Sequence, residues 1–160
     1  MNIRRAEEGD LEAIVRINNA EAEKTPWVGN PLEIGFFKQS LDIPLFYVAE
    51  QENQVVGFMM VMDENTPYDS KYFQWFKQRF EEFLYIDRLV VDPAKRRQGI
   101  AKKIYERLFK DHGERPITGE ITIFPENAVS LEFHEKLGFQ AIGTLDSDDK
   151  SKTCAMYVLY

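Results

Sequence analysis

The sequence of 160 residues contains a single cysteine, Cys154, and only two histidines. One thiol cannot form an intrachain disulfide, and a zinc site built from several cysteines would have too few ligands. Chains that do without disulfides are typical of reducing compartments. We therefore expect a cytoplasmic protein whose chemistry needs no metal ion.

Long apolar runs and an excess of positive charge are missing as well. No stretch approaches the roughly 18 consecutive apolar residues that a membrane-spanning helix needs, and the first ten residues, MNIRRAEEGD, carry charges where a signal peptide has its apolar core. The 27 acidic residues outnumber the 20 basic ones, which gives a formal net charge of -7. Because binding to a phosphate backbone needs a clustered basic face, we expect neither nucleic acid nor a membrane as a partner.

What the chain does contain is an alternation of short apolar segments with amphipathic ones, in a length that suits one domain. Runs rich in Val, Ile, Phe and Tyr, bounded by turn residues, predict strands, and apolar residues three and four positions apart predict helices. The predicted strands cover residues 2–5, 45–50, 55–62, 83–92, 117–124, 139–145 and 153–160. The predicted helices lie within residues 7–24, 30–42, 63–82, 98–113 and 127–139.

The segment DPAKRRQGIAKKIYERL, residues 92–108, is the most informative part of the sequence. It follows a predicted strand and leads into an amphipathic helix, whose first backbone N–H groups favour a bound anion. Gly99 would let a ligand approach the main chain, because no Cβ stands in the way. Arg96, Arg97, Lys102 and Lys103 add local positive charge in an acidic protein. The segment therefore predicts a phosphate site, although a solvated basic face at a helix start is the alternative.

Two common phosphate-binding patterns do not fit this segment. The nucleotide-binding pattern G-x-x-x-x-G-K-[ST] is absent, and the glycines of the dinucleotide fingerprint are missing. The remaining interpretation is a phosphorylated ligand that is bound in a different way.

The residues RRQGIA, positions 96–101, match the acyl-CoA signature Q/R-x-x-G-x-G/A of the GNAT acetyltransferase superfamily. Two further stretches agree with this. ENAVSLEFHEKLGF resembles the second block of that family, and IRRAEEGDLEAIVRI is similar to its first strand and helix. The chain thus resembles a GNAT N-acetyltransferase over most of its length, in the family's order. It departs from the pattern in having Arg97 where many members have glycine, and Ala101 in place of the commoner second glycine.

The resemblance implies an α/β (α+β) fold with a mixed, V-shaped central sheet flanked by helices, formed by one N-acetyltransferase domain over residues 1–160. Acetyl-CoA would be the cofactor and CoA the product. The backbone of residues 97–102 would hold the pyrophosphate, and that of Leu89 and Val91 the pantetheine arm. The full set of cofactor-binding residues that the resemblance implies is Leu89, Val90, Val91, Arg96, Arg97, Gln98, Gly99, Ile100, Ala101, Lys102, Asn127 and Ser130.

Two carboxylates are candidates for assisting the loss of a proton from an amine. An alkylammonium with a pKa of ~10.4 is mostly charged at pH 7, so a base near the reacting nitrogen matters. Asp87 lies in the apolar run FLYIDRLVV and matches the strand position of the glutamate base in histone-acetylating members. An ion pair with Arg88, or an exposed edge position, is the alternative. Glu120, on the strand ITGEITIF, is the second candidate and could equally position the ammonium group.

The helix within 127–139 carries a third candidate, His134. The resemblance places it where most members have a tyrosine that protonates the departing thiolate, and an imidazolium could do the same. A structural histidine is the alternative. Asn127, Ser130 and His134 are expected on one polar stripe beside a buried stripe of Val129, Phe133 and Leu137. Asn127 could also be a helix N-cap.

The segment at about 63–82 is an aromatic-rich insertion relative to the family, which joins these two strands by a short turn. We expect its rings to line the acceptor pocket, where they would favour a cation or an apolar chain. The residues concerned are Tyr68, Tyr72, Phe73, Trp75 and Phe76. Packing against the sheet, or against a second copy in a homodimer, is the alternative.

These features together predict an acetyl-CoA-dependent N-acetyltransferase that transfers an acetyl group directly to a primary amine on a small molecule or a peptide. A catalytically silent acyl-CoA-binding or sensing module is the alternative, since the insertion could serve as an interface.

Overall fold

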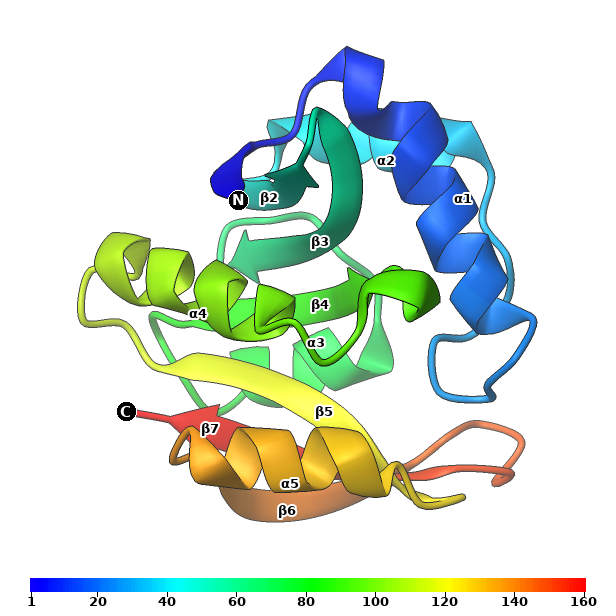
Figure 1. Ribbon diagram of the computed structural model, residues 1–160. Helices are drawn as coiled ribbons and strands as arrows, with labels where there is room; N and C mark the ends of the chain where they lie inside the picture. Colours follow the sequence, from blue (N-terminus) through cyan, green and yellow to red (C-terminus); the bar gives the residue numbers. More distant parts are fainter. The chain divides into compact units, whose positions relative to one another are not determined.

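The computed structural model describes residues 1–160, which fold into two compact units (Figure 1). The first unit contains residues 1–62 and 87–113, and the second contains residues 63–86 and 114–160. Strand β4 (Leu84–Val91) contributes its first residues to the second unit and its last residues to the first. The seven strands hydrogen-bond in the order β1-β2-β3-β4-β5-β7-β6.

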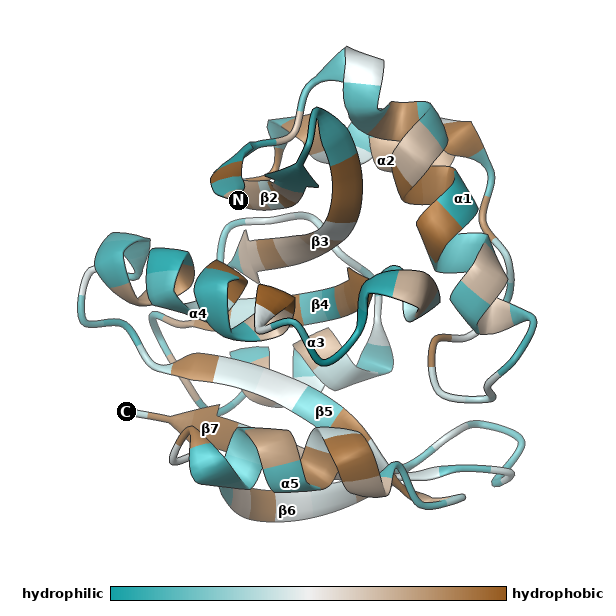
Figure 2. Ribbon diagram, in the orientation of Figure 1, coloured by the Kyte–Doolittle hydropathy of each residue, from teal (hydrophilic) through white to brown (hydrophobic).

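The first unit is built on strands β1, β2 and β3 and on three helices. Its elements are β1 (Asn2–Arg5), α1 (Leu11–Ala22), α2 (Ile34–Gln39), β2 (Leu45–Gln51), β3 (Gln54–Asp63) and α4 (Ile100–Asp111). Strands β1, β2 and β3 form an antiparallel ladder. Figure 2 shows α4 with hydrophilic residues along one side and hydrophobic residues along the other. Its apolar side is buried through Ile100, Ile104, Tyr105 and Leu108, which fixes the start of the helix to the core.

The second unit contains α3 (Lys71–Lys77), β5 (Ile117–Phe124), α5 (Ala128–Lys136), β6 (Gln140–Asp146) and β7 (Thr153–Leu159). Strand β7 lies between β5 and β6 and is antiparallel to both. Strand β4 pairs with β5 in parallel through only two residue pairs, Leu84 with Ile117 and Tyr85 with Thr118. Parallel and antiparallel pairs therefore occur in one sheet, and the predicted α/β (α+β) class with a mixed sheet is confirmed.

The predicted strands are present with small shifts at their ends, and each predicted helix lies within its range, although α3 covers only Lys71–Lys77 of residues 63–82. The hairpin of β2 and β3 turns at Glu52 and Asn53, both of which have positive φ. The buried stripe expected in the last helix is wrong, because no residue of α5 is fully buried and the side chain of Val129 is 82% exposed. Phe133 and Leu137 are half-buried. No helix combines the length and the hydrophobicity that crossing a membrane requires.

Gly57 allows close packing beneath the loop that follows β4. A Cβ atom at this position would lie 3.1 Å from the carbonyl oxygen of Val90 and 3.3 Å from Cγ2 of Ile100. Both distances are tighter than ordinary van der Waals contact, so a larger side chain would push against β4 and the first residue of α4. A glycine on β3 thus helps to fix where the loop between β4 and α4 begins and ends.

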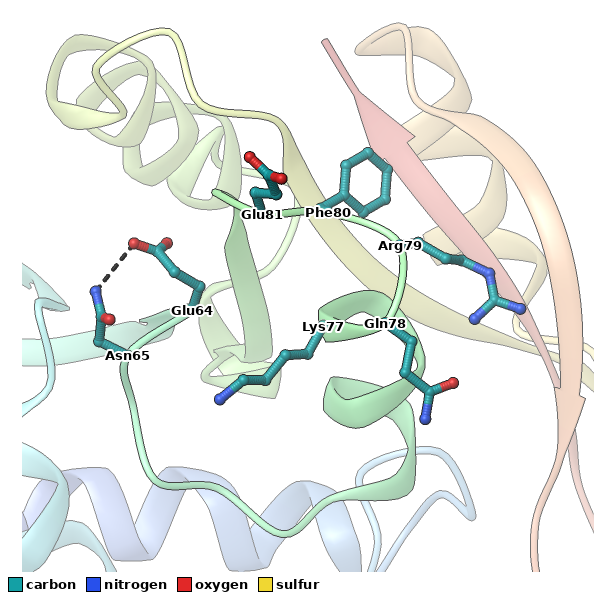
Figure 3. A pocket seen from close by; sticks show the side chains of 7 residues that line it. All are labelled: Glu64, Asn65, Lys77, Gln78, Arg79, Phe80 and Glu81. Atoms are coloured by element: carbon teal, nitrogen blue, oxygen red, sulfur yellow. Dashed lines mark hydrogen bonds between the residues drawn. The ribbon is translucent and has the colours of Figure 1, made fainter.

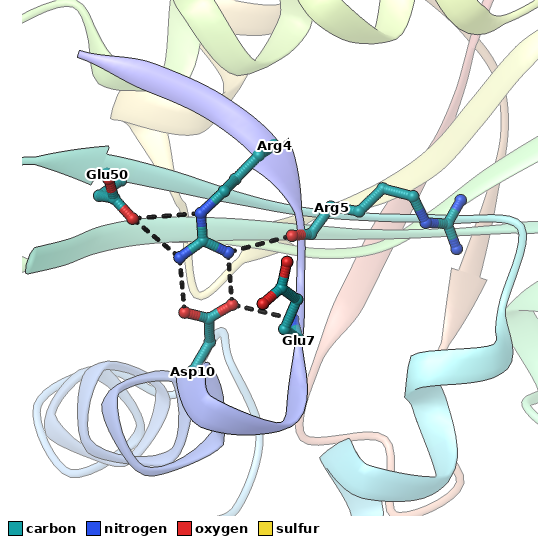
Figure 4. A network of polar contacts seen from close by, with 5 residues as sticks. All are labelled: Arg4, Arg5, Glu7, Asp10 and Glu50. Atoms are coloured by element: carbon teal, nitrogen blue, oxygen red, sulfur yellow. Dashed lines mark hydrogen bonds and ion pairs between the residues drawn. The ribbon is translucent and has the colours of Figure 1, made fainter. Parts of the chain in front are cut away.

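A part-buried ion-pair network holds the amino-terminal strand within the first unit (Figure 4). The guanidinium of Arg4 donates to both carboxylate oxygens of Asp10, at 2.7 and 2.8 Å, and to Glu50 at 2.8 Å. Asp10 also accepts a hydrogen bond from the backbone N–H of Glu7. Burial alone would raise the pKa of Asp10, but the hydrogen bonds from Arg4 and Glu7 outweigh it and lower the pKa below its usual value.

Replacing Asp10 should therefore destabilise the protein in a pH-dependent way. We expect Asp10→Ala to lower the free energy of unfolding by about 2 kcal/mol at pH 7, since it leaves a part-buried guanidinium with one carboxylate partner fewer. A carboxylate with a lowered pKa stabilises the fold above its unfolded pKa of about 3.9, and this contribution is lost as the pH falls through the lower folded value. The gap between variant and wild type should therefore narrow in urea titrations below about pH 4.

The matched control is Glu8→Gln, which removes an exposed ion pair with Lys38. It should leave the free energy of unfolding close to that of wild type, because an ion pair in open solvent contributes little. An Asp10→Ala protein as stable as the control at pH 7 would contradict the structural role of the network.

Candidate active site

The loop between β4 and α4 has two residues in the left-handed conformation. Asp92 begins the loop by accepting a hydrogen bond from the N–H of Ala94 at 2.9 Å. Arg97 then has φ 62° and Gly99 has φ 76°. This backbone explains why glycine is common at the position of Arg97, because only glycine adopts positive φ without strain. The Cβ position of Gly99 meets no atom within 4 Å, so the main chain there faces open space.

The basic side chains of this loop have different partners. Arg96 forms an ion pair with the buried carboxylate of Glu21 on α1, so its charge is already balanced within the first unit. Arg97, Lys102 and Lys103 are exposed. The positive charge available to a ligand at the start of α4 therefore comes from these three residues and from the helix N-terminus.

On β4, Asp87 has the partner that the alternative interpretation named. Its Oδ2 lies 3.0 Å from Nε of Arg88, and both side chains are largely buried. Arg88 in turn donates to Oδ1 of the fully buried Asn18 on α1 at 2.7 Å. Asp87 is thus held in a polar network rather than among apolar side chains. Sequence inspection missed Asn18, because its place on the buried side of α1 beside β4 depends on the tertiary fold.

Glu120 lies on β5 in the second unit, where it accepts a hydrogen bond from the hydroxyl of Tyr85 at 3.0 Å. Tyr85 is fully buried, and Glu120 is half-buried. Sequence inspection also missed Tyr85. No local pattern in the sequence could have found it, because only the pairing of β4 with β5 brings Tyr85 onto the strand beside Glu120.

His134 and Ser130 are adjacent on α5, as the helical spacing predicts. Nδ1 of His134 lies 2.7 Å from the carbonyl oxygen of Ser130 and 3.2 Å from its hydroxyl. A carbonyl oxygen only accepts, so Nδ1 carries a hydrogen and Nε2 is the acceptor nitrogen of the neutral ring. Asn127 is the helix N-cap, since its side chain accepts from the N–H of Ser130 at 3.3 Å.

Burial lowers the pKa of His134 below its ordinary value, although the hydrogen bond to Ser130 acts in the opposite direction. The ring is therefore mostly neutral at pH 7. In this tautomer and charge state Nε2 can take up a proton but has none to give. The geometry thus argues against the expected proton donation by a resting imidazolium.

The insertion at 63–82 is packed into the second unit through its aromatic rings. Phe73 and Phe76 are fully buried and lie 5.4 and 6.0 Å from Tyr85, measured between ring centroids. For these two residues the structure shows the packing alternative rather than a pocket wall. Tyr68, Tyr72 and Trp75 are half-buried, so they alone among the expected acceptor residues reach the surface.

Helix α3 is anchored on strand β6 of the same unit. A Cβ atom on Gly143 would lie 2.7 Å from the ring of Trp75, so the indole occupies the space that a side chain would take. Lys71 donates to the carbonyl oxygen of Asp146 at 2.6 Å and pairs with Asp148 at 2.9 Å. These contacts fix the helix at both its start and its middle.

Two surface hollows of about 420 and 410 Å³ lie in the second unit. Figure 3 shows the larger one, beside the carboxyl-terminal end of α3, with Lys77 and Arg79 opposite Glu64 and Glu81. Glu64 accepts from Asn65 and from the backbone of Phe83, so it serves the local fold. Neither hollow is lined by Glu120, His134 or residues 96–102. The hollows and the candidate chemistry therefore do not coincide.

A model of the acetyltransferase (GNAT) family matches residues 11–139. The chain belongs to the acetyltransferase (GNAT) family. It is therefore an acyltransferase of the N-acetyltransferase kind, and the expectation of acetyl-CoA as the acetyl donor is confirmed. Members of the family act on amine acceptors.

Solved structures agree with this GNAT fold. The ribosomal-protein-alanine N-acetyltransferase of Brucella melitensis matches with a TM-score of 0.77 and 23% identity over 99% of each chain. An N-acetyltransferase from Staphylococcus aureus Mu50 matches with a TM-score of 0.73 and 27% identity, covering 99% of this chain and 96% of that chain. YncA from Salmonella typhimurium, solved with its cofactor acetyl-CoA, matches with a TM-score of 0.74 and 20% identity, covering 99% and 92%. Comparison with curated protein sequences finds no match.

The pKa of His134 gives a direct check on the local geometry of this acetyltransferase. Because burial disfavours the imidazolium, the His134 signal should titrate below about 6.5 in proton NMR, with the assignment taken from His134→Gln. Between the folded pKa and the unfolded value of about 6.5 the unfolded chain binds more protons, so stability falls as the pH drops through this window. The melting temperature of His134→Gln should fall less than that of wild type when the pH is lowered from 7.5 to 5.5. A midpoint for His134 at or above 6.5 would contradict the buried, neutral ring.

Proposed function

We propose that this protein transfers the acetyl group of acetyl-CoA directly to a primary amine, with donor and acceptor bound together in one ternary complex. The observation that carries the proposal is the loop at the start of α4. There, Arg97 and Gly99 adopt left-handed backbone, open space lies beside Gly99, and exposed basic side chains follow. Such a loop suits a diphosphate, because N–H groups at a helix N-terminus favour an anion.

The residues present fit the CoA group that the family uses. Backbone N–H groups of residues 97–102 would bind the pyrophosphate, with Arg97 and Lys102 adding charge and Arg96 retained by Glu21 as a support for the loop. Leu89, Val90 and Val91 would bind the pantetheine arm through the backbone of β4. Asn127 and Ser130 complete the proposed cofactor set. Bound acetyl-CoA would supply an activated acetyl group.

The acceptor must lose one proton before it attacks. We assign this task to Asp87 or Glu120, the two carboxylates on β4 and β5, with Asp87 positioned by Arg88. The neutral nitrogen then bonds to the thioester carbonyl carbon, the carbon–sulfur bond breaks, and the electron pair leaves on sulfur. In our proposal Nε2 of His134 accepts the remaining proton from nitrogen and returns it to the thiolate, in keeping with its neutral resting state. The products are an N-acetylated amine and CoA.

The proposed acceptor is a small-molecule or peptide amine, and the half-buried insertion residues Tyr68, Tyr72 and Trp75 are its proposed contacts. We also propose that residues 1–160 form a single acetyltransferase domain and that the protein is located in the cytoplasm. A homodimer through the insertion is the remaining proposal about assembly.

The proposal is tested by two measurements on the full chain. Calorimetric titration with CoA should give saturable binding, and thiol release from acetyl-CoA should rise when suitable amines from a panel are added. Release that depends on the acceptor supports the enzyme. Tight CoA binding without turnover of any amine would support the silent binding module instead, and the absence of CoA binding would overturn both.

Gly99→Ala should weaken CoA binding and also destabilise the protein. A left-handed conformation costs an alanine about 1–2 kcal/mol, and its methyl group would occupy the open space beside the loop. We expect CoA affinity to fall several-fold in calorimetry, with about 1 kcal/mol less stability in urea.

The control for this variant is Gly35→Ala, at a helical position where the Cβ meets no atom within 4 Å. It should keep CoA affinity and stability, since alanine is favoured within helices. Equal CoA affinity for the two variants would argue against the loop as the pyrophosphate site.

A further inference from the structure

Helix α1 is tied to the loop between β4 and α4 by two ion pairs within the first unit. A nitrogen of the Arg16 guanidinium lies 3.3 Å from a carboxylate oxygen of Asp92, the first residue of the loop. Glu21, in the last turn of the helix, pairs with Arg96. Between the two pairs lies the short 3-10 helix Pro93–Lys95, which follows β4 and lies beside α1 (Figure 1). The loop is therefore held to α1 on both sides of this turn.

The two ion pairs differ in how far their charges are removed from water. The Arg16 side chain is 61% exposed, so its pair with Asp92 contributes little. The side chain of Glu21 is only 8% exposed. A carboxylate buried to this degree needs a partner, because water no longer solvates its charge. Glu21 therefore keeps the guanidinium of Arg96 in place.

The position of Arg96 matters because the left-handed part of the loop follows it directly. Arg97 has φ 62° and Gly99 has φ 76°. Left-handed backbone is strained for a residue with a Cβ, so at Arg97 it persists only where the surroundings impose it. The ion pair of the preceding residue with Glu21 is such a constraint. Without it, Arg97 could leave this conformation, and the N–H groups proposed to bind the diphosphate would change direction.

The same ion pair limits what Arg96 itself can bind. A guanidinium that turned toward a phosphate would leave the buried carboxylate of Glu21 uncompensated, so phosphate binding through Arg96 would gain little. The side chains of Arg97, Lys102 and Lys103 are exposed, so they can reach an anion at lower cost. Arg96 is thus suited to hold the loop, while its neighbours supply charge to a ligand.

We propose that Glu21 is a positioning residue for the cofactor: through Arg96 it holds the loop in the conformation that binds the diphosphate of CoA, without contacting CoA. This inference rests on the acetyl-CoA site proposed above and deepens it by naming the residue of α1 that sets the affinity for the diphosphate. A negatively charged side chain thereby strengthens the binding of a negatively charged ligand. Repulsion between like charges alone would have the opposite effect.

The main experiment measures how the CoA affinity changes when Glu21 loses its charge. Glu21→Gln keeps the size of the side chain but leaves Arg96 without its anion, so calorimetric titration should give a CoA affinity at least about tenfold lower. If Arg96 were a phosphate ligand held back by Glu21, the variant would instead bind CoA more tightly. A CoA affinity equal to or above that of wild type overturns the inference.

The matched control is Glu23→Gln, which removes the same charge at an exposed position where the same helix ends. It should bind CoA within about twofold of wild type, because solvent and salt screen an exposed charge. A loss in the control as large as that in Glu21→Gln would contradict the assignment to Glu21.

Inorganic pyrophosphate tests whether the effect lies in the diphosphate. It is titrated into isotope-labelled full-length protein while the amide signal of Gly99 is followed by NMR. Its affinity should fall in Glu21→Gln by a factor similar to that for CoA. Lower CoA affinity together with an unchanged pyrophosphate affinity would overturn the proposed role of the loop.

Steady-state kinetics separate positioning from a general loss of structure. With an amine that supports thiol release, Glu21→Gln should raise the KM for acetyl-CoA at least about fivefold and leave the KM for the amine unchanged. An equal rise in both KM values would contradict a role confined to the cofactor.

A measurement on the wild-type protein covers the case in which Glu21→Gln does not fold. During titration with CoA, the amide signal of Gly99 should shift, whereas the guanidinium signal of Arg96 should stay in place because it remains paired with Glu21. A larger shift for Arg96 than for Gly99 would identify Arg96 as a phosphate ligand and overturn the inference.

The inference and the proposed function fail in different ways. Wild-type protein that binds CoA and releases thiol, with unchanged CoA affinity in Glu21→Gln, would overturn only the role of Glu21. The absence of CoA binding by the wild-type protein would overturn the proposed function, and this inference with it.

Discussion

The parallel ladder between β4 and β5 covers two residue pairs, Leu84 with Ile117 and Tyr85 with Thr118. Backbone hydrogen bonds of this kind fix the register of two strands, and register decides which side chains share a face. Every candidate residue on these strands lies beyond the ladder in the chain. Asp87 follows it on β4, the loop of residues 92–99 comes after β4, and Glu120 follows it on β5. Within the second unit, these two pairs therefore fix the register in which Tyr85 reaches Glu120.

The two units hold their candidate residues by different means. In the first unit, ion pairs hold the candidate residues: the exposed Arg96 pairs with the buried Glu21, and Asp87 pairs with Arg88, which also donates to Asn18. Removing the arginine of either pair would leave the buried carboxylate of Asp87 or Glu21 without its cation, which is costly, so these contacts hold their residues firmly. In the second unit, the support that holds Glu120 is neutral, since the hydroxyl of the buried Tyr85 donates to its carboxylate.

His134 shows how the surroundings of a side chain change the chemistry that its residue type suggests. Position in the HEKLGF block favours a proton donor, as in the family's usual tyrosine. Its hydrogen bond to the Ser130 carbonyl and its burial instead favour a neutral ring that accepts at Nε2. The insertion gives a similar lesson. Its helical spacing was readable, yet Phe73 and Phe76 are core residues, and only Tyr68, Tyr72 and Trp75 reach the surface.

The sequence by itself determined the order of strands and helices, the loop before α4 and membership of the acetyltransferase family, because hydrophobic periodicity, glycine positions and the RRQGIA motif are local signals. It also placed Asn127 as a helix cap and Ser130 beside His134, since these depend on helical spacing alone. Only the tertiary structure decided that Tyr85 holds Glu120, that Arg88 reaches Asn18 and that Trp75 seats on Gly143. Each of these contacts joins residues distant in the chain through strand register and side-chain packing, which no local pattern encodes.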